Sequence, residues 1–121
     1  GILGLSYKSN LKVHTLSPML PFIDYLKKKN IIVNLYDPYY SKKEIKKIAN
    51  VNTFKFPSAI NKFDCLVFHV NHKFFERFYK RISKKSKLKY LIDNTGALKK
   101  YDEDLKKRGT KYILTGDKNW L

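Results

Sequence analysis

The sequence predicts a three-layer α/β domain with a mostly parallel sheet of about five to six strands. Short apolar runs alternate with segments of helical periodicity along the whole chain. The most apolar run, at 65–70, is hydrophobic at nearly every position, which is typical of a strand buried on both faces of a parallel sheet. The length of 121 residues fits one domain, so we expect 1–121 to form a single unit without linkers or repeats.

The first half of the chain is predicted to begin with a buried strand over 1–7, an apolar run that ends in a polar loop. Ser17 and Pro18 then start a helix, because serine accepts from free helix N–H groups and proline suits the first helical position. Its apolar residues share one face, and the lysines at 27–29 complement the helix dipole. The remaining predicted elements are a β-branched strand at 31–35, a polar surface helix capped by Ser41 at 41–49, a weaker strand at 51–56 and helical turns within 57–63.

The second half continues the alternation of strands and helices. The apolar strand at 65–70 precedes a helix at 73–82, in which aromatic residues recur at helical spacing. A strand at 89–92 precedes a helix at 98–108, which Gly109 ends because glycine is a common residue after a helix C-terminus. Residues 112–114 form the last strand, and the basic run at 83–89 predicts a solvated loop.

The chain carries 26 lysines and arginines against 10 acidic residues, a formal net charge of +16. Such a charge favours nucleic acid or an anionic surface as a partner. Only Arg77, Arg81 and Arg108 are arginines, however, and arginine is the side chain that binds phosphates and bases at two points. The lysines accompany many Asn, Ile, Tyr and Phe residues, as the codon usage of an AT-rich genome produces. Non-specific nucleic-acid binding therefore ranks last among the functions considered.

A single cysteine, Cys65, excludes a disulfide framework and any zinc site made of several cysteines. At the start of the apolar strand, it is expected to be a small buried hydrophobe and not a nucleophile. His69 and His72 are expected at different depths, which argues against a metal site, and His14 is expected at the surface. No run is long enough to span a membrane and no signal-peptide pattern is present, so we expect a cytoplasmic protein without a membrane partner.

Ligands of parallel sheets bind beyond the carboxyl ends of the strands, which here are followed by residues 7–10, 37–40, 71–72 and 93–96. No glycine-rich dinucleotide cradle, P-loop or nucleophile elbow is present in the sequence. Asp37 and Asp93 follow strands, where aspartate commonly caps a helix or fixes a turn.

The best local candidate for a binding site is Tyr7 and Lys8, followed by Asn10. A lysine just after the first strand is well placed to meet a phosphate, and the helix start at Ser17 supplies backbone N–H groups for the same charge. The alternative is that Lys8 is one more solvated surface lysine.

Five short motifs occur in order along nearly the whole chain: Gly4-Leu5-Ser6-Tyr7-Lys8-Ser9-Asn10, Ser17-Pro18, Tyr36-Asp37-Pro38-Tyr39, Asp64 with His72 and Phe75 around the apolar strand, and Asp93 with Gly96. Together they resemble the C-terminal domain of the UDP-glucose/GDP-mannose dehydrogenase family, and the UDP-N-acetylmannosamine dehydrogenase branch is the most similar.

The resemblance implies a Rossmann-like domain that holds the nucleotide end of a UDP-sugar in an NAD-dependent oxidoreductase of polysaccharide biosynthesis, which oxidises the sugar at C6. It places NAD and the catalytic cysteine in an N-terminal domain, so this chain would be a fragment that holds no cofactor and performs no catalysis alone. Its implied partners are the UDP-sugar, the N-terminal and central dimerisation domains, and further copies in a homo-oligomer. The implied site residues are Tyr7, Lys8 and Asn10 on the nucleotide sugar, Ser17 capping the adjacent helix, and Asp93 and Thr95 at the opposite rim.

The chain departs from the family's pattern where that pattern has cations. Between Asn10 and Ser17 the family has two aspartates and an arginine, where this chain has Lys12, Val13 and Thr15. In the final turn, Thr95 stands in the place of an arginine or lysine. Charge-assisted contacts supply a large share of phosphate recognition. A degenerate domain of the same fold, used for oligomerisation or as a scaffold, therefore remains an open alternative.

Overall fold

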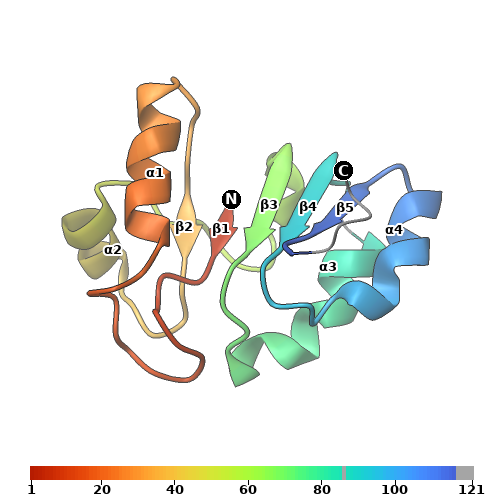
Figure 1. The fold of residues 1–121 in the computed structure, drawn as a ribbon, viewed down its shortest axis with the longest axis horizontal. Helices are drawn as coiled ribbons and strands as arrows, with labels where there is room; N and C mark the ends of the chain where they lie inside the picture. The colour runs from red at the N-terminus through yellow and green to blue at the C-terminus, as the bar shows by residue number, and fades with distance from the viewer. Residues whose placement is uncertain (86, 117–121) are drawn as a thin grey trace.

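The computed structural model describes residues 1–85 and 87–116. They form a five-stranded sheet in the order β2-β1-β3-β4-β5, in which every neighbouring pair is parallel (Figure 1). The predicted α/β fold class and the parallel sheet are confirmed. The strands are β1 (Ile2–Leu3), β2 (Leu35–Tyr36), β3 (Cys65–Phe68), β4 (Tyr90–Asp93) and β5 (Lys111–Leu114).

Helical segments connect the strands. The α-helices of the described residues are α1 (Met19–Lys28), α2 (Lys42–Ala49), α3 (Tyr79–Lys85) and α4 (Asp102–Lys107). Three 3₁₀ segments accompany them: η1 (Ile60–Lys62), η2 (Lys73–Phe78) and η3 (Lys99–Tyr101). The predicted helices at 73–82 and 98–108 thus each begin as a 3₁₀ turn and continue as an α-helix. None of the described helices has the length and apolar content needed to cross a bilayer.

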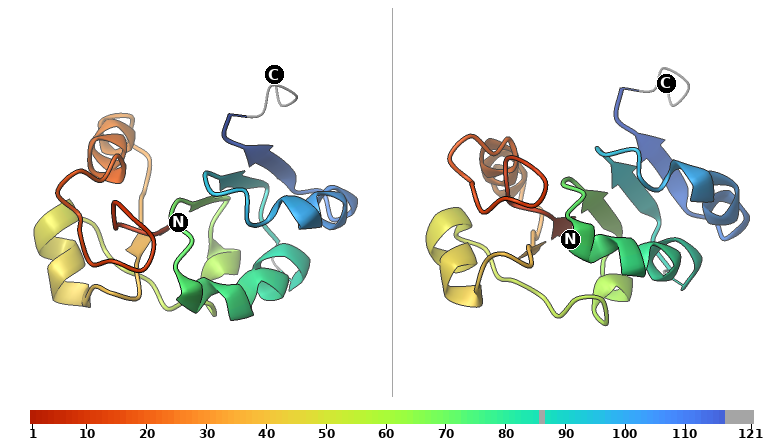
Figure 2. Two further views of the ribbon diagram at one scale, coloured as in Figure 1. Left: turned by 60° about the horizontal axis from the view of Figure 1, so that its bottom comes forward. Right: turned by 90° about the horizontal axis from the view of Figure 1, so that it is seen from below.

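The two faces of the sheet are covered unequally (Figure 2). The connection from β1 to β2 runs in one direction along the sheet, and the later connections run in the other. Because crossovers between parallel strands are right-handed, opposite directions place their helices on opposite faces. Helix α1 therefore lies over β1 and β2 on one face, while η2, α3 and α4 lie on the other, and α2 packs at the β2 edge.

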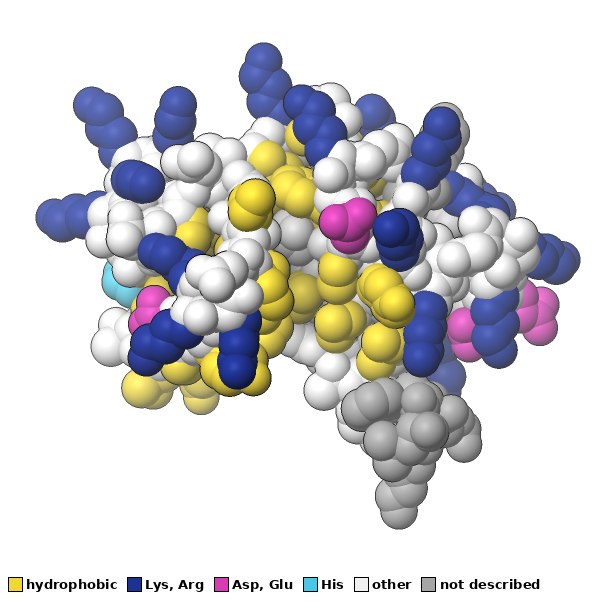
Figure 3. Space-filling model, turned by 90° about the horizontal axis from the view of Figure 1, so that it is seen from above, with side chains coloured by type: hydrophobic (Ala, Val, Ile, Leu, Met, Phe, Trp, Pro, Cys, Tyr) yellow, Lys and Arg dark blue, Asp and Glu magenta, His cyan; other side chains and the backbone are white. Residues whose placement is uncertain are grey.

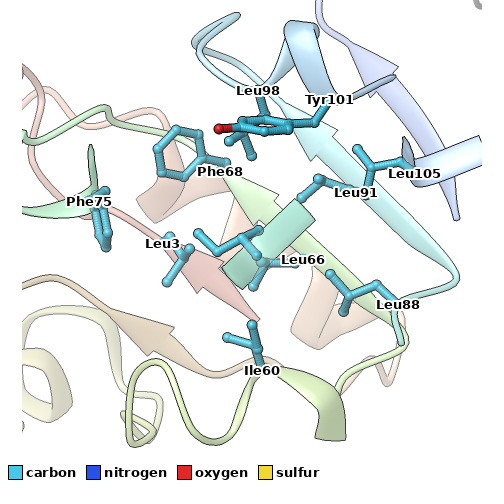
Figure 4. Packing of buried hydrophobic residues seen from close by; sticks show 11 residues of the cluster. Leu3, Ile60, Leu66, Phe68, Phe75, Leu88, Leu91, Leu98, Tyr101 and Leu105 are labelled. Carbon is cyan, nitrogen blue, oxygen red and sulfur yellow. The ribbon is translucent and has the colours of Figure 1, made fainter. Parts of the chain in front are cut away.

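The larger core cluster lies between the sheet and the helices η2, α3 and α4 (Figure 4). Leu3, Leu66, Phe68 and Leu91 contribute the strand side and are almost completely buried. The second cluster joins α1 to the opposite face and to α2. Its strand members include Ile2, Leu35 and Val67, and its α1 members are Met19, Ile23 and their partly buried neighbours.

The predicted strand at 31–35 is wrong for most of its length. Only Leu35 enters a strand, while Ile31 and Ile32 stay outside the sheet and are 49% and 89% exposed. Strand β1 pairs with β2 over two residues, and the Ile31 N–H donates to the Leu26 carbonyl in α1 instead of to a neighbouring strand. The weaker strand at 51–56 is reduced to one isolated bridge between Asn52 and Asn34.

The predicted solvated loop at 83–89 is also wrong in part. Helix α3 extends to Lys85, and Ser83 is fully buried. Leu88 is buried in the larger core cluster, and its carbonyl accepts a 2.6 Å hydrogen bond from the Thr110 hydroxyl. The basic run therefore returns to the core at its one apolar residue, Leu88. Residue 86 lies outside the described residues.

The predicted Ser41 cap is confirmed as a complete capping box. The Ser41 hydroxyl accepts from the Glu44 N–H at 3.2 Å, and the Glu44 carboxylate accepts from the Ser41 N–H at 3.0 Å. Helix α1 begins one residue later than predicted, with Pro18 in the cap position. The Ser17 hydroxyl still accepts a hydrogen bond from the Met19 N–H at 3.2 Å.

Candidate functional site

The chain leaves β1 toward one side of the sheet to form β2 and returns on the other side to form β3. At this reversal, the carboxyl ends of the neighbouring strands β1 and β3 lie side by side, which is the place where α/β sheets bind ligands. The segments that follow β1, β2 and β3 all reach this edge. The candidate site is therefore built from the loop 4–10, from Asp37 after β2 and from residues 69–73 after β3.

Asp37 connects the first two of these segments. Its carboxylate is completely buried and accepts from the N–H of Leu5 at 2.8 Å, from the N–H and hydroxyl of Ser6 at 3.1 and 3.2 Å, and from the N–H of Tyr39 at 2.9 Å. Burial alone would raise the pKa of Asp37, but its hydrogen bonds with His72, Tyr39 and Ser6 outweigh that effect and lower the pKa. Asp37 is thus a buried carboxylate that fixes the start of the loop after β1.

His72 connects the loop after β1 to the segment after β3. Its Nε2 lies 3.0 Å from the Asp37 carboxylate, and its Nδ1 accepts the Asn10 N–H at 2.9 Å. Because Nδ1 accepts a hydrogen bond, the proton of the neutral ring belongs on Nε2, which donates it to Asp37. The Asn10 side chain in turn accepts from the Lys73 N–H at 2.7 Å. The loop is therefore held at both ends, and Asn10 has the left-handed φ of 61° that the turn requires.

The residues between these two anchors, including Tyr7 and Lys8, are exposed. Tyr7 is 44% exposed, and its N–H donates to the Val13 carbonyl at 2.6 Å. The Lys8 ammonium lies 5.8 Å from the centre of the Tyr7 ring. Among the described residues, Lys8 forms no ion pair. The loop thus presents an aromatic ring and a free cation from a rigidly held backbone.

Asp93 and Thr95 lie at the same edge, after β4, and form a closed hydrogen-bonded turn. The buried Asp93 carboxylate accepts from the Thr95 N–H and hydroxyl at 2.8 Å, from the Gly96 and Leu98 N–H groups at 3.0 Å, and from the Tyr112 hydroxyl at 2.7 Å. The Thr95 hydroxyl also accepts from the Ala97 N–H at 3.0 Å. Asp93 shapes the turn, as aspartates after strands commonly do, and Thr95 closes it.

His69 lies between the two loops. Its Nδ1 is 3.1 Å from the Asn94 side-chain nitrogen, which links the end of β3 to the turn after β4. Its Nε2 is buried and has no hydrogen-bond partner among the described residues. Burial lowers the pKa of His69, so the ring is neutral at pH 7. The polar side chains after β2, β3 and β4 at this edge are therefore neutral or bonded to one another. In the loop after β1, Lys8 supplies a positive charge that no described acidic group pairs.

The sequence-predicted site residues occupy three places along this edge. Tyr7, Lys8 and Asn10 share the loop after β1, Ser17 is buried at the start of α1, and Asp93 and Thr95 share the turn after β4. Sequence reasoning missed that His72 joins the loop to Asp37. The signal was present, because polar residues follow three neighbouring strands at one edge.

The described residues 1–85 and 87–116 bring no group of three or more His, Cys, Asp or Glu side chains together as a metal site. Cys65 begins β3 at the opposite edge of the sheet, and burial raises the pKa of its thiol. Gly4 lies at a close approach between the loop after β1 and the segment after β3. A Cβ there would lie 2.9 Å from the Val70 backbone nitrogen, so this glycine allows two loops to approach each other.

Comparison with known proteins adds an independent result. Residues 1–100 match the model of the UDP-glucose/GDP-mannose dehydrogenase family, UDP binding domain. The chain is 34% identical to a UDP-N-acetyl-D-mannosamine dehydrogenase of Methanococcus vannielii over 130 residues, which cover 98% of this chain. It is 31% identical to a protein of the same description from Methanococcus aeolicus over 127 residues, which cover all of this chain. In both cases, the match spans 27% of the relative's length.

Proposed function

The chain belongs to the UDP-glucose/GDP-mannose dehydrogenase family, as its UDP-binding domain, and from this premise we propose that the edge between β1 and β3 binds the UDP half of a nucleotide sugar. The observation that carries the proposal is the loop after β1, which Asp37 and His72 hold in place while Tyr7 and Lys8 are exposed. A rigid loop places a cation with little loss of conformational entropy on binding.

Each exposed group suits one part of UDP. The Lys8 ammonium is a point charge that pairs with a phosphate oxygen, and the Tyr7 ring offers a flat apolar surface for a base. The start of α1 at Ser17 adds helix N–H groups and the positive end of a helix dipole at the same edge. The polar atoms of Asp93 and Thr95 bond to each other and to their own turn. These two residues are therefore expected to shape the opposite rim of the site and not to bind the ligand directly.

The affinity is expected to be low, because the positions that are cationic in the family are neutral here and the nearby Lys12 is engaged in an ion pair. Thr15 and Thr95 carry no charge, and Lys12 pairs with Glu44 at 2.6 Å. The hydrogen bond from Lys12 lowers the pKa of Glu44 to about 2, so this pair is fully ionised at neutral pH. Lys8 is thus left as the principal cation for the diphosphate.

We further propose that this chain acts as the substrate-binding part of a longer, NAD-dependent dehydrogenase of polysaccharide biosynthesis in the cytoplasm. Its length, about a quarter of that of its relatives, supports this division of labour. The described residues do not fit NAD themselves, because the first turn lacks the glycine pattern of a dinucleotide cradle. NAD, the catalytic cysteine and the dimerisation region would belong to other parts of such an enzyme.

Isothermal titration calorimetry of the 121-residue chain with UDP and with UDP-N-acetylmannosamine tests the proposal. We expect binding, and we expect Lys8→Ala to weaken it about tenfold or more, since a charge-assisted contact to a phosphate is lost. Lys80→Ala is the matched control, because Lys80 is exposed on α3, outside the three segments that build the candidate site. Absence of heat at millimolar ligand, with folding confirmed by circular dichroism, would contradict the proposal.

One alternative has an observation in its favour. The Thr95 hydroxyl is bonded within its own turn, where the family has a free cation, so a scaffolding or oligomerisation role for a degenerate site is the second candidate. Nucleic-acid binding rests on charge alone and predicts heparin retention that is lost steeply with added salt, without sequence preference.

A further inference from the structure

Among residues 1–85 and 87–116, no helix lies over one half of one sheet face. Helix α1 lies over β1 and β2, while β3, β4 and β5 carry no described helix on the same side (Figures 1 and 2). Sheets made only of parallel strands occur almost always with both faces covered, because their side chains are apolar on both faces. The uncovered half of this face is therefore expected to bind another structural element or another protein.

A groove of about 1140 Å³ opens on this side, at the amino ends of the strands. Ile2, Val67 and Ile92 line it and are register partners across β1, β3 and β4, so they share this face. The C-terminal half of α1 lines it with Phe22 and Leu26. The segment that leads into β3 contributes residues 53–55, 58–59 and 62–64. This groove lies at the opposite edge of the sheet from the UDP site proposed above.

Large apolar side chains in and beside the groove are exposed to solvent. Ile32 is 89% exposed and Ile31 is 49% exposed, and both line the groove. Tyr90, at the start of β4, is 46% exposed and shares the face of its register partner Cys65. Contiguous exposed apolar side chains rimmed by polar residues mark interaction sites.

Lysines surround this apolar surface (Figure 3). Lys55 and Lys62 line the groove itself, residues 27–29 continue α1 directly after Leu26, and Lys111 is the register partner of Tyr90. Among the described residues of the lining, the acidic one is Asp64, and its carboxylate lies 3.9 Å from the Lys89 ammonium. A second copy of this chain would bring one lysine rim against another, and each copy carries a net charge of +16. Repulsion between these like charges opposes self-association through the groove.

We propose that the groove is a docking surface for an amphipathic α-helix whose apolar stripe is flanked by aspartates and glutamates. A helix fits because α1 already packs on the same face, and helices are the elements that cover parallel sheets. The apolar stripe would cover Ile32, Val67 and Ile92, while the acidic flanks would meet Lys55, Lys62 and the end of α1. The inference does not depend on UDP binding, because the two surfaces share no residue.

A synthetic peptide tests this proposal directly. The probe is a fluorescein-labelled helix of about five turns, with leucines at positions a, d and e of each heptad and glutamates on both flanks. Its control has the same composition with the leucines redistributed around the helix. Fluorescence anisotropy is measured with the 121-residue chain at about 0.1 M salt, and UDP is titrated in parallel to show that the two events are separate.

We expect Ile32→Asp and Lys62→Glu each to weaken binding of the peptide about tenfold. Leu16→Asp and Lys80→Glu are the matched controls, because Leu16 is 69% exposed outside the groove and Lys80 is exposed on α3. Both controls should bind as the parent chain does. The proposal is overturned if no binding occurs at about 100 μM, if the redistributed peptide binds equally, or if the groove variants match their controls. A dimer in sedimentation velocity that Ile32→Asp abolishes would also overturn it, since a second copy would then be the occupant.

Discussion

Replacing Asp37 by asparagine is expected to destabilise the protein severely, although the two side chains have the same shape. The carboxylate accepts hydrogen bonds from Leu5, Ser6, Tyr39 and His72 inside the protein. An asparagine keeps one acceptor oxygen and turns the other position into a donor that faces a donor. Loss of one charge-assisted bond costs about 1.5–3 kcal/mol, and the buried unpaired donor costs a further 1–3 kcal/mol, so we expect a loss of about 4 kcal/mol. That is a large fraction of a stability of roughly 5–15 kcal/mol.

The assay is urea unfolding at pH 7, followed by circular dichroism at 222 nm, with Asp64→Asn as the control. The Asp64 side chain is 89% exposed, so its amide variant should change the free energy of unfolding by less than about 0.5 kcal/mol. In thermal unfolding, the Asp37→Asn variant should melt roughly 15 °C below the parent chain.

The pH dependence of the free energy of unfolding provides a second, independent test of this prediction. The folded pKa of Asp37 is lowered from its ordinary value of 3.8, so its stabilisation is present above that value and is lost as the pH falls through the folded pKa. The gap between the parent and the Asp37→Asn variant should therefore be full at neutral pH and should shrink below about pH 4. A loss under about 1 kcal/mol at pH 7, or a gap of equal size at pH 7 and pH 3, would refute the reasoning.

Two further predictions concern the loop edge. Gly4→Ala should cost about 3 kcal/mol in urea unfolding, because Gly4 has a φ of +107° and the added Cβ would lie 2.9 Å from Val70. Gly109→Ala, with a φ of +82° and nothing within 4 Å of the added Cβ, should cost only about 1 kcal/mol, and equal costs would refute the steric argument. Thr15→Arg combined with Thr95→Arg should tighten UDP binding about tenfold or more by calorimetry, if lost cations limit the site. Unchanged affinity in that double variant would favour the scaffolding alternative.

The alternation of strands and helices was readable from the sequence because each element carries its own local signal. Ser41 predicts a helix start through a hydrogen bond that closes within four residues, and this cap forms, together with the reciprocal bond from Ser41 to Glu44. The apolar run that begins at Cys65 predicts a central strand, since it needs apolar neighbours on both faces wherever it lies.

Local patterns failed where the outcome depended on a distant partner. The β-branched run at Ile31 and Ile32 has strand propensity, but β2 can pair only where β1 runs beside it. Leu88 sits in a basic run, yet the core between α3 and β4 buries it. In both cases, tertiary contacts overrode a preference that is worth only about 1 kcal/mol.

The sequence by itself determined the fold class, and it predicted a ligand site at one edge of the sheet with Tyr7 and Lys8 in it. The periodicity of apolar residues and the polar positions after strands suffice for that, because both are properties of neighbouring residues. Only the tertiary structure decided that Asp37 and His72 hold this loop, since their bonds join positions 31 to 62 residues apart. It alone also decided that no described helix covers half of one sheet face, because the strand order and the handedness of the crossovers set which face each helix covers.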